Sequence, residues 1–196
     1  MDEKTLRSII EEVMKEFGAN VLRIQVGQPT IDPASQLYDA GYFAMINQRV
    51  REALDSGFVV SLSLQWEKPE SAPRQSRPDV NSQQIWQKFA TAWGDDTRVI
   101  FELYNEPKGE PTAENWKVWL RGGPYAENPS GQSVGIQTLI DTVRDAGAKN
   151  VLLLPGLKLQ KSLERLPVDE VVDPLNNFGF AFHTPNLTRG VETLEE

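Results

Sequence analysis

The chain has 196 residues, a length typical of one domain, and we expect a single domain over residues 1–196. Its formal net charge of -8 disfavours nucleic acid and acidic membranes as partners, because both select basic surfaces. The sequence holds no cysteine, which excludes disulfides and thiolate chemistry, and no apolar run approaches the length of a membrane span. The N-terminal segment MDEKTLRSIIEEV is acidic and lacks the pattern of a signal peptide. The sequence therefore does not determine the cellular compartment of the protein.

Strand-like and helix-like segments alternate along the chain. Runs of β-branched and aliphatic residues predict strands, and apolar residues at three- to four-residue spacing predict helices. In chain order we expect a helix over 6–17, a strand over 21–26, a helix over 43–54, a strand over 58–64, a helix over 81–93 capped by Asn81, a strand over 98–104, a helix capped by Ser133 and ended by Gly147, a strand over 150–156, a short helix over 162–166 and a strand over 177–183. This order predicts parallel βαβ units and an α/β fold with about five parallel strands.

Polar and aromatic residues gather where the predicted strands end. In parallel α/β folds the reactive groups lie at the carboxyl ends of the strands. The residues of this kind at those ends are Gln28, Gln65, Trp66, Glu67, Asn105, Glu106 and His183. Because side chains alternate along a strand, we expect Glu102, Tyr104 and Glu106 to share one face. Glu106 is then a candidate general acid at the rim, and a turn cap or an ion pair with Lys108 is the alternative interpretation.

The segment DDTRVIFELYNEPKG, residues 95–109, resembles the signature of the cellulase-type glycoside hydrolases, glycoside hydrolase family five, a (β/α)₈-barrel group. Four further stretches resemble the second, third, fifth and sixth strands of that family: ANVLRIQV, SGFVVSLSLQ, AGAKNVLLLPG and GFAFHTPNLTRG. The resemblance covers nearly the whole chain and implies a partial or reduced (β/α) TIM-barrel-like fold. It further implies that Glu106 is the acid/base, that Asn105 holds the 2-hydroxyl of the sugar, and that Arg23 and His183 belong to the substrate site.

The sequence also departs from the pattern of the family. Gln65 stands where a His is usual, and Thr184 and Pro185 follow His183 where a Tyr is common. The nucleophile Glu of the seventh strand has no counterpart here, nor have the first, seventh and eighth strands. In the resembled family the Arg at position 23 contacts that nucleophile. Without it, Arg23 needs another carboxylate, and the sequence offers Glu102 or Glu106.

A glycosidase site needs a second carboxylate beside its general acid. Glu67, at the end of the neighbouring strand, is the best candidate within the chain, and its alternative interpretation is a rim residue paired with Arg74 or Arg77. Asp173, Glu127 and Glu192 are acids in loops that the sequence does not place, and an acid from a partner chain is a further source. At the same strand end, Trp66 is a candidate platform for stacking against a sugar, and Gln65 is a candidate substrate contact.

Two functional hypotheses follow. The first is a cellulase-like glycoside hydrolase that cleaves β-1,4-glucan or related β-glycosides with Glu106 as general acid/base. The second is a catalytically incomplete, saccharide-binding module of the same fold. Five strands would leave an apolar inner face and two open edges, which favour a homodimer or an assembly role. The residue spacings suggest no metal or other cofactor, and the family resemblance suggests a secreted protein.

Overall fold

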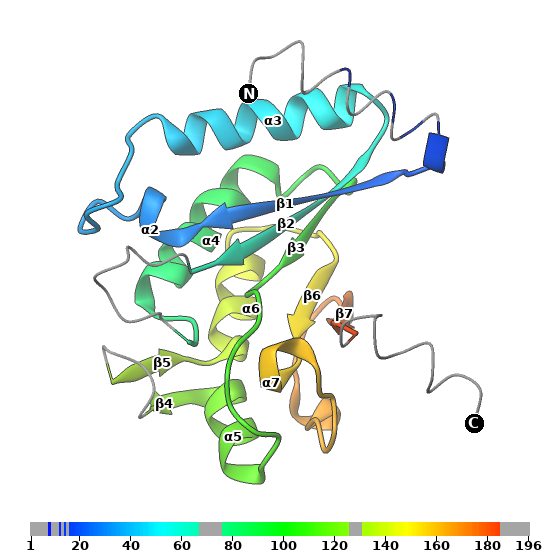
Figure 1. Ribbon diagram of the computed structural model, residues 1–196. Coiled ribbons are helices and arrows are strands. Elements are labelled where there is room, and N and C mark those ends of the chain that lie inside the picture. Colours follow the sequence, from blue (N-terminus) through cyan, green and yellow to red (C-terminus); the bar gives the residue numbers. More distant parts are fainter. Residues whose placement is uncertain are drawn as a thin grey trace.

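The main sheet of this protein holds five parallel strands. The structure, a computed structural model, describes residues 8, 12, 14, 16–66, 76–125 and 131–184. The strands follow the order β1–β2–β3–β6–β7 (Figure 1). Their bounds are β1 Val21–Gly27, β2 Val59–Gln65, β3 Val99–Glu102, β6 Leu152–Pro155 and β7 Phe178–Ala181. Within the described residues this sheet stays open, with β1 and β7 as its edges, and the predicted partial, barrel-like α/β fold is confirmed.

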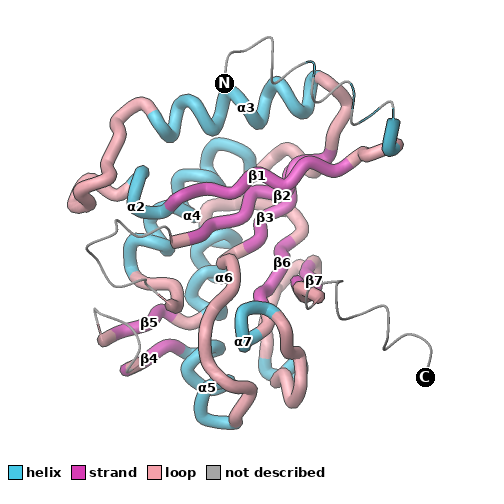
Figure 2. Tube along the Cα trace, viewed as in Figure 1, coloured by secondary structure: helices cyan, strands magenta, loops and turns pink. Residues whose placement is uncertain are grey.

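Helices connect these strands. Among the described residues they are α2 Gln28–Ile31, α3 Tyr42–Asp55, α4 Val80–Trp93, α5 Ala113–Arg121, α6 Ile136–Asp145, α7 Leu157–Gln160 and the 3-10 helix η1 Val168–Glu170. An antiparallel pair, β4 Gly122–Pro124 with β5 Gln132–Val134, follows α5 (Figure 2). In the part of the chain that the structure describes, no helix has both the length and the apolar character that crossing a bilayer requires.

One face of the sheet packs against α3, α4 and α6 and forms the core. The strand register places Leu62 beside Phe101, and Phe101 beside Leu152, and all three are fully buried. Each helix adds buried apolar residues from one stripe: Ile46, Val50, Ala53 and Leu54 of α3, Ile85, Trp86 and Phe89 of α4, and Leu139, Ile140 and Val143 of α6. The apolar residues whose three- to four-residue spacing predicted these helices are therefore the residues that the helices bury against the sheet.

The opposite face of the sheet carries polar side chains at its centre. The register pairs Ser63 of β2 with Gln25 of β1 on one side and with Glu102 of β3 on the other. Ser61, Ser63 and Glu102 are buried although they are polar, and Leu153 continues the row on β6. The expectation of an apolar inner face is therefore wrong. The face carries a charged and hydrogen-bonding centre, which the site described below uses.

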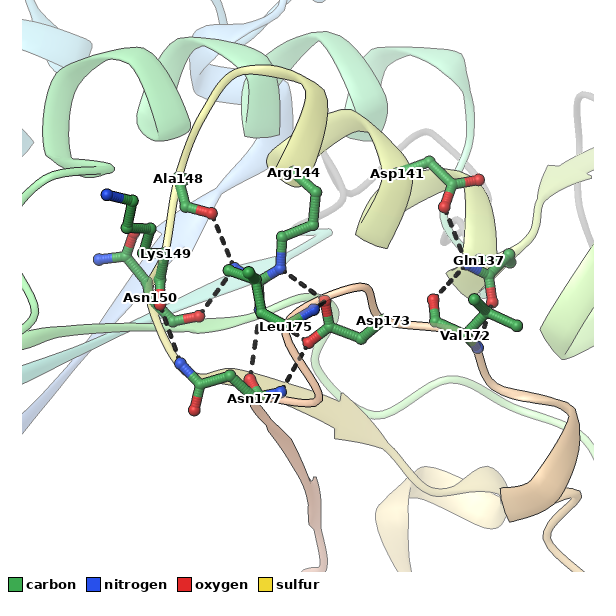
Figure 3. Close-up of polar contacts among 10 residues, drawn as sticks. All are labelled: Gln137, Asp141, Arg144, Ala148, Lys149, Asn150, Val172, Asp173, Leu175 and Asn177. Atoms are coloured by element: carbon green, nitrogen blue, oxygen red, sulfur yellow. Dashed lines mark hydrogen bonds and ion pairs between the residues drawn. The ribbon is translucent and has the colours of Figure 1, made fainter.

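A buried ion pair fixes the connection that leads into β7 (Figure 3). Arg144, at the end of α6, has its Nε 2.7 Å from Oδ1 of Asp173 and its Nη2 2.9 Å from Oδ2. Burial raises the pKa of Asp173, but hydrogen bonds from Arg144 and from the backbone N–H groups of Asn177 and Leu175, with the charge of Arg144, hold that pKa below its usual range. The pair ties α6 to the start of β7 and so helps to place His183, two residues beyond that strand.

Two predicted helix caps differ from the structure. Asp79, not Asn81, caps α4, because its Oδ1 accepts hydrogen bonds from the backbone N–H groups of Asn81 and Ser82. Ser133 does not cap α6 but lies in β5, and Gly135 occupies the cap position. The α4 cap is thus an earlier side chain than predicted, and the α6 cap is a glycine without a side-chain hydrogen bond.

Two further predicted helices have different outcomes. The predicted helix over 162–166 is wrong, since the helical turn in this region is α7, which ends at Gln160. The predicted helix over 6–17 lies largely outside the described residues, of which 8, 12, 14, 16 and 17 are helical. Its last apolar residue, Phe17, is 78% exposed and so does not join the core of the described part.

Candidate active site

The candidate acid, Glu106, lies in a turn beyond the end of β3. The strand stops at Glu102 rather than at Tyr104, so regular alternation does not continue to Glu106. The φ angle of Glu106 is 53°, a left-handed conformation that is uncommon for residues other than glycine. The turn is anchored by the backbone N–H of Asn105, which donates to the carbonyl of Leu64 at 2.7 Å. The expectation that Glu102, Tyr104 and Glu106 share one strand face is therefore wrong.

Arg23 on β1 is the charged centre of this strand edge. Its Nε lies 2.6 Å from Oε2 of Glu102 and its Nη2 lies 2.7 Å from Oε1, which makes a bidentate pair. The Nη2 also donates to Oγ of Ser63 and to Oδ1 of Asn105, each at 2.8 Å. The side chain of Glu102 is 3% exposed and that of Arg23 is 33% exposed. Of the two carboxylates that the sequence offered to Arg23, the structure pairs it with Glu102 and not with Glu106.

Arg23 in turn orients the side-chain amide of Asn105. Because Oδ1 of Asn105 accepts from the guanidinium, its Nδ2 faces the other way and lies 3.4 Å from Oε1 of Gln65. Asn105 is buried, at 5% exposure, so its amide has little freedom to rotate. The Nδ2 group is therefore a fixed donor at the ends of β2 and β3.

His183 lies beside Glu106 at the same strand edge. Its Nδ1 is 3.1 Å from Oε1 of Glu106, and the two side chains are 31% and 33% exposed. The backbone N–H of His183 donates to the carbonyl of Gln160 at 2.7 Å, which fixes the chain beyond β7. The contact brings together the segments that follow β3 and β7, although β6 lies between these strands in the sheet. A carboxyl group and an imidazole thus face solvent side by side.

Gln160 is a residue of this site that the sequence reasoning missed. It is fully buried, its Oε1 accepts from the backbone N–H of Glu106 at 2.7 Å, and its Nε2 donates to Oε1 of Glu102 at 3.2 Å. It belongs to α7, which leaves the end of β6 (Figure 1). The segment LKLQ carries no pattern for this role, because Gln160 reaches the site through consecutive left-handed residues that include Lys158 and Leu159.

Three of the tryptophans serve the core rather than the site. Trp116 and Trp119 of α5 are each 2% exposed, and their rings meet edge to face with centroids 5.3 Å apart. Trp86 of α4 is buried too, and its indole N–H donates to the carbonyl of Leu103 at 2.8 Å, just before the Glu106 turn. All three side chains therefore pack inward. Trp66 is half-buried at the end of β2.

Five of the predicted site residues therefore meet in one hydrogen-bonded group. They are Arg23, Gln65, Asn105, Glu106 and His183, and they are linked through Glu102 and Gln160. Glu67 lies outside the described residues, as does Arg74. Across the described ranges, no cluster of three or more His, Cys, Asp or Glu side chains is arranged to hold a metal ion. The arrangement can donate and accept protons at Glu106 and His183 and can hydrogen-bond a hydroxyl-rich ligand through Asn105.

Comparison with known proteins relates this chain to a family of glycoside hydrolases. The sequence profile described as Cellulase (glycosyl hydrolase family 5) matches residues 1–188. The manganese dependent endoglucanase Eg5A of Phanerodontia chrysosporium is 28% identical over 170 residues, which are 81% of this chain and 40% of that protein. The xyloglucan-specific endo-β-1,4-glucanase BoGH5A of Bacteroides ovatus is 26% identical over 160 residues, 74% of this chain and 29% of that protein. The chain thus spans less than half the length of these two relatives.

The fold has counterparts among solved structures. Thermotoga maritima Cel5A, solved in complex with cellobiose, superposes with a TM-score of 0.61 at 18% identity. The match covers 92% of this chain and 52% of that chain. At this identity the likeness concerns the fold, and it agrees with the partial barrel-like sheet described above.

Proposed function

The chain belongs to the cellulase family, glycosyl hydrolase family 5, and on that premise we propose that it hydrolyses β-1,4-glucan or related β-glycosides with Glu106 as general acid/base. The observation that carries the proposal is the contact between Glu106 and His183, two half-exposed groups held at the carboxyl ends of parallel strands. Active sites of (β/α) barrels lie at this edge of the sheet. Arg23 is bound to Glu102, whereas the carboxyl of Glu106 lies beside His183.

In the proposed reaction Glu106 donates its proton to the glycosidic oxygen as the bond to the anomeric carbon breaks. A second carboxylate either attacks the anomeric carbon or activates water at it. Its distance from Glu106 decides the stereochemical course: about 5–5.5 Å retains the configuration and about 6.5–9.5 Å inverts it. In the retaining course Glu106 then takes a proton from a water molecule that attacks the anomeric carbon and displaces the second carboxylate, which returns the site to its starting state. In the inverting course the second carboxylate takes the proton of the attacking water, and proton exchange with solvent returns both carboxyl groups to their starting states.

The second carboxylate is proposed to be Glu67 or an acid from a partner chain. Glu102 is unsuited to this role, because Oε2 accepts from Arg23 and Oε1 accepts from both Arg23 and Gln160. Its side chain is also only 3% exposed, so a sugar cannot reach it without displacing the network. A nucleophile or base needs a lone pair that faces the substrate.

The remaining site residues are proposed to bind the glycan. Asn105 would donate its Nδ2 to a sugar hydroxyl, and His183 and Gln65 would contact neighbouring hydroxyls, while Arg23 keeps the amide of Asn105 in place. Trp66 would stack on an apolar sugar face. The net charge of -8 suits a neutral polysaccharide. The names of the two relatives, an endoglucanase and an endo-β-1,4-glucanase, support the substrate class.

A second copy of the chain is a proposed partner. Within the described ranges β1 and β7 are the edge strands of the sheet, and backbone groups at an edge strand favour pairing with another chain. A dimer would also offer a source for the second carboxylate. Light scattering at several protein concentrations tests this proposal, and a mass that stays that of one chain at the assay concentration contradicts it.

A second candidate function is saccharide binding without hydrolysis. The observation that favours it is the state of Glu102, a buried carboxylate that Arg23 binds and that therefore does not serve as the second catalytic acid. The two functions separate in one experiment, in which the chain is mixed with a soluble β-1,4-glucan and the new reducing ends are counted. Release of reducing ends supports the hydrolase. Calorimetric binding of a cello-oligosaccharide without release supports the binding module, and the absence of both contradicts both.

A further inference from the structure

We propose that Gln160 is a positioning residue of this site, which holds the main chain of Glu106 and joins it to Glu102 and His183. The inference rests on the proposed function only in taking Glu106 as the acid/base. It concerns a residue that lies about fifty positions from Glu106 in the sequence and in a different βα unit. Its basis is a set of three hydrogen bonds made by one residue.

The three bonds use both ends of the side-chain amide and the backbone carbonyl. Oε1 of Gln160 accepts from the N–H of Glu106 at 2.7 Å, and Nε2 donates to Oε1 of Glu102 at 3.2 Å. The carbonyl of Gln160 accepts from the N–H of His183 at 2.7 Å. Because Gln160 is fully buried, solvent cannot replace these partners if the side chain is lost. One residue therefore joins the segments that follow β3, β6 and β7.

The backbone at both ends of the main contact is unusual. Glu106 has φ 53° and Gln160 has φ 59°, and residues other than glycine keep such conformations where their surroundings hold them. Two backbone hydrogen bonds dock α7 on the loop after Glu106: Lys158 N–H donates to Gly109 O at 2.9 Å and Leu159 N–H donates to Pro107 O at 3.0 Å. The Gln160 amide adds the bond that reaches Glu106 itself.

The direction of the Glu106 side chain follows from this backbone conformation. Without the acceptor at Gln160, the turn is free to relax toward a right-handed or extended conformation, which swings the carboxyl away from His183. A general acid displaced by a fraction of an ångström loses much of its effect, because proton transfer depends on distance and angle. Gln160 thus acts through Glu106 and does not itself need to touch substrate.

Asn150 offers a matched control for this role. It is a buried amide as well, 1% exposed, and its Nδ2 donates to the carbonyls of Trp93, Asp96 and Val99. It lies just before β6, at the opposite end of the strand from Gln160. Gln160→Met and Asn150→Leu both replace an amide by an apolar group of similar shape. A general loss of stability is common to both variants, whereas loss of position at Glu106 belongs to Gln160→Met alone.

The first readout is amide hydrogen exchange at Glu106, with the NMR signal of the His183 ring as a second probe. His183 is the single histidine of the sequence, so its ring signals are assigned without ambiguity. We expect Gln160→Met to speed exchange at Glu106 by about tenfold relative to Asn150→Leu and to shift the His183 ring signals at fixed pH. Equal protection of Glu106 in the two variants overturns the proposal.

Two further measurements keep the test decisive. Gln160→Glu keeps an oxygen acceptor for the N–H of Glu106 and sets a second buried carboxyl group against Glu102, so that the two share a proton, and we expect it to restore part of the protection at Glu106. Should Gln160→Met not fold, the wild-type chain provides the test: a nuclear Overhauser contact between the Glu106 N–H and the Gln160 side-chain amide supports the proposal, and its absence overturns it.

Measurements of hydrolysis separate the positioning role of Gln160 from the proposed hydrolase function. If the wild-type chain hydrolyses a soluble β-1,4-glucan, we expect Gln160→Met to lower kcat with little change in KM, and Asn150→Leu to leave both close to wild type at a temperature where it is folded. An unchanged kcat in Gln160→Met overturns the positioning role. If the wild-type chain releases no reducing ends, the proposed hydrolase function fails, and the exchange experiment still decides whether Gln160 holds Glu106.

Discussion

Arg23 on β1 binds Glu102 at the end of β3 with Nε and Oε2 2.6 Å apart, although β2 lies between the two strands. The arginine reaches across β2 on the inner face of the sheet and also binds Ser63 on the way. The consequence concerns a third residue, Glu106. Its carboxyl is not the partner of the guanidinium but lies 3.1 Å from His183. The strand edge therefore holds one buried carboxylate bound by an arginine and a second, one third exposed, that lies beside a histidine.

The first prediction concerns this ion pair. Arg23→Met leaves the carboxylate of Glu102 buried without its cation, and loss of one partner of a buried pair is costly. Because Arg23 is one third exposed, we expect a loss of about 2–3 kcal/mol in the free energy of unfolding, below the full range for buried pairs. Urea denaturation measures it. Arg121→Met, which breaks the exposed pair with Glu170, is the control and should cost about 0.5 kcal/mol or less. Equal losses in the two variants contradict the buried-pair account.

The second prediction concerns Asp173 and pH. The pKa of Asp173 in the folded protein lies below its usual value, so the folded state holds this proton less readily than the unfolded state does. The stability that the Arg144 pair contributes is therefore present above about pH 4 and is lost as the pH falls through the folded-state pKa. We expect Asp173→Asn to cost about 3 kcal/mol near neutral pH and progressively less in acid. Urea midpoints measured over this range test the prediction, and parallel pH profiles for the two proteins contradict it.

The third prediction uses two glycines with positive φ. A Cβ added at Gly109, where φ is +115°, would lie 2.6 Å from Nη2 of the buried Arg77, whereas one added at Gly131, where φ is +69°, meets nothing within 4 Å. We expect Gly131→Ala to cost about 1 kcal/mol from backbone strain alone, and Gly109→Ala to cost about 2–4 kcal/mol. The carbonyl of Gly109 also accepts from Lys158, so Gly109→Ala should disturb the turn next to Glu106. Thermal unfolding of both variants checks the difference, and equal shifts in Tm contradict it.

Much of the fold was predictable because hydrophobic periodicity reports burial directly. The five strands and the helices α3, α4 and α6 each bury one face, and the periodicity of that face is visible in the sequence. The segment 107–132 was harder, because its Gly and Pro content resembles a loop. It contains α5 and the pair β4–β5, and the one local signal was Thr112, whose side chain accepts from the N–H of Asn115 as a helix cap.

The site was predictable only in part. Asn105, Glu106 and His183 lie at the carboxyl ends of predicted strands, and parallel strands bring these ends to one edge. Arg23 lies inside β1, and the family resemblance indicated it. Gln160 was not predictable, because its contacts depend on a left-handed turn that residues other than glycine rarely adopt. The end of β3 at Glu102 was not predictable either. Residues that favour strands continue past Glu102, although the strand itself ends there.

The central claim, that Glu106 is the acid/base of a β-glycan hydrolase, is tested most directly by the rate of reducing-end release from a soluble β-1,4-glucan by wild type and Glu106→Gln. Glu164→Gln, at a side chain that is 66% exposed, serves as the control for a change of one charge. We predict that wild type and Glu164→Gln hydrolyse the glucan at similar rates and that Glu106→Gln is slower by about 10²–10⁴-fold, with binding of a cello-oligosaccharide retained. Hydrolysis by Glu106→Gln at the wild-type rate, or the absence of hydrolysis by the wild-type chain, would contradict the claim.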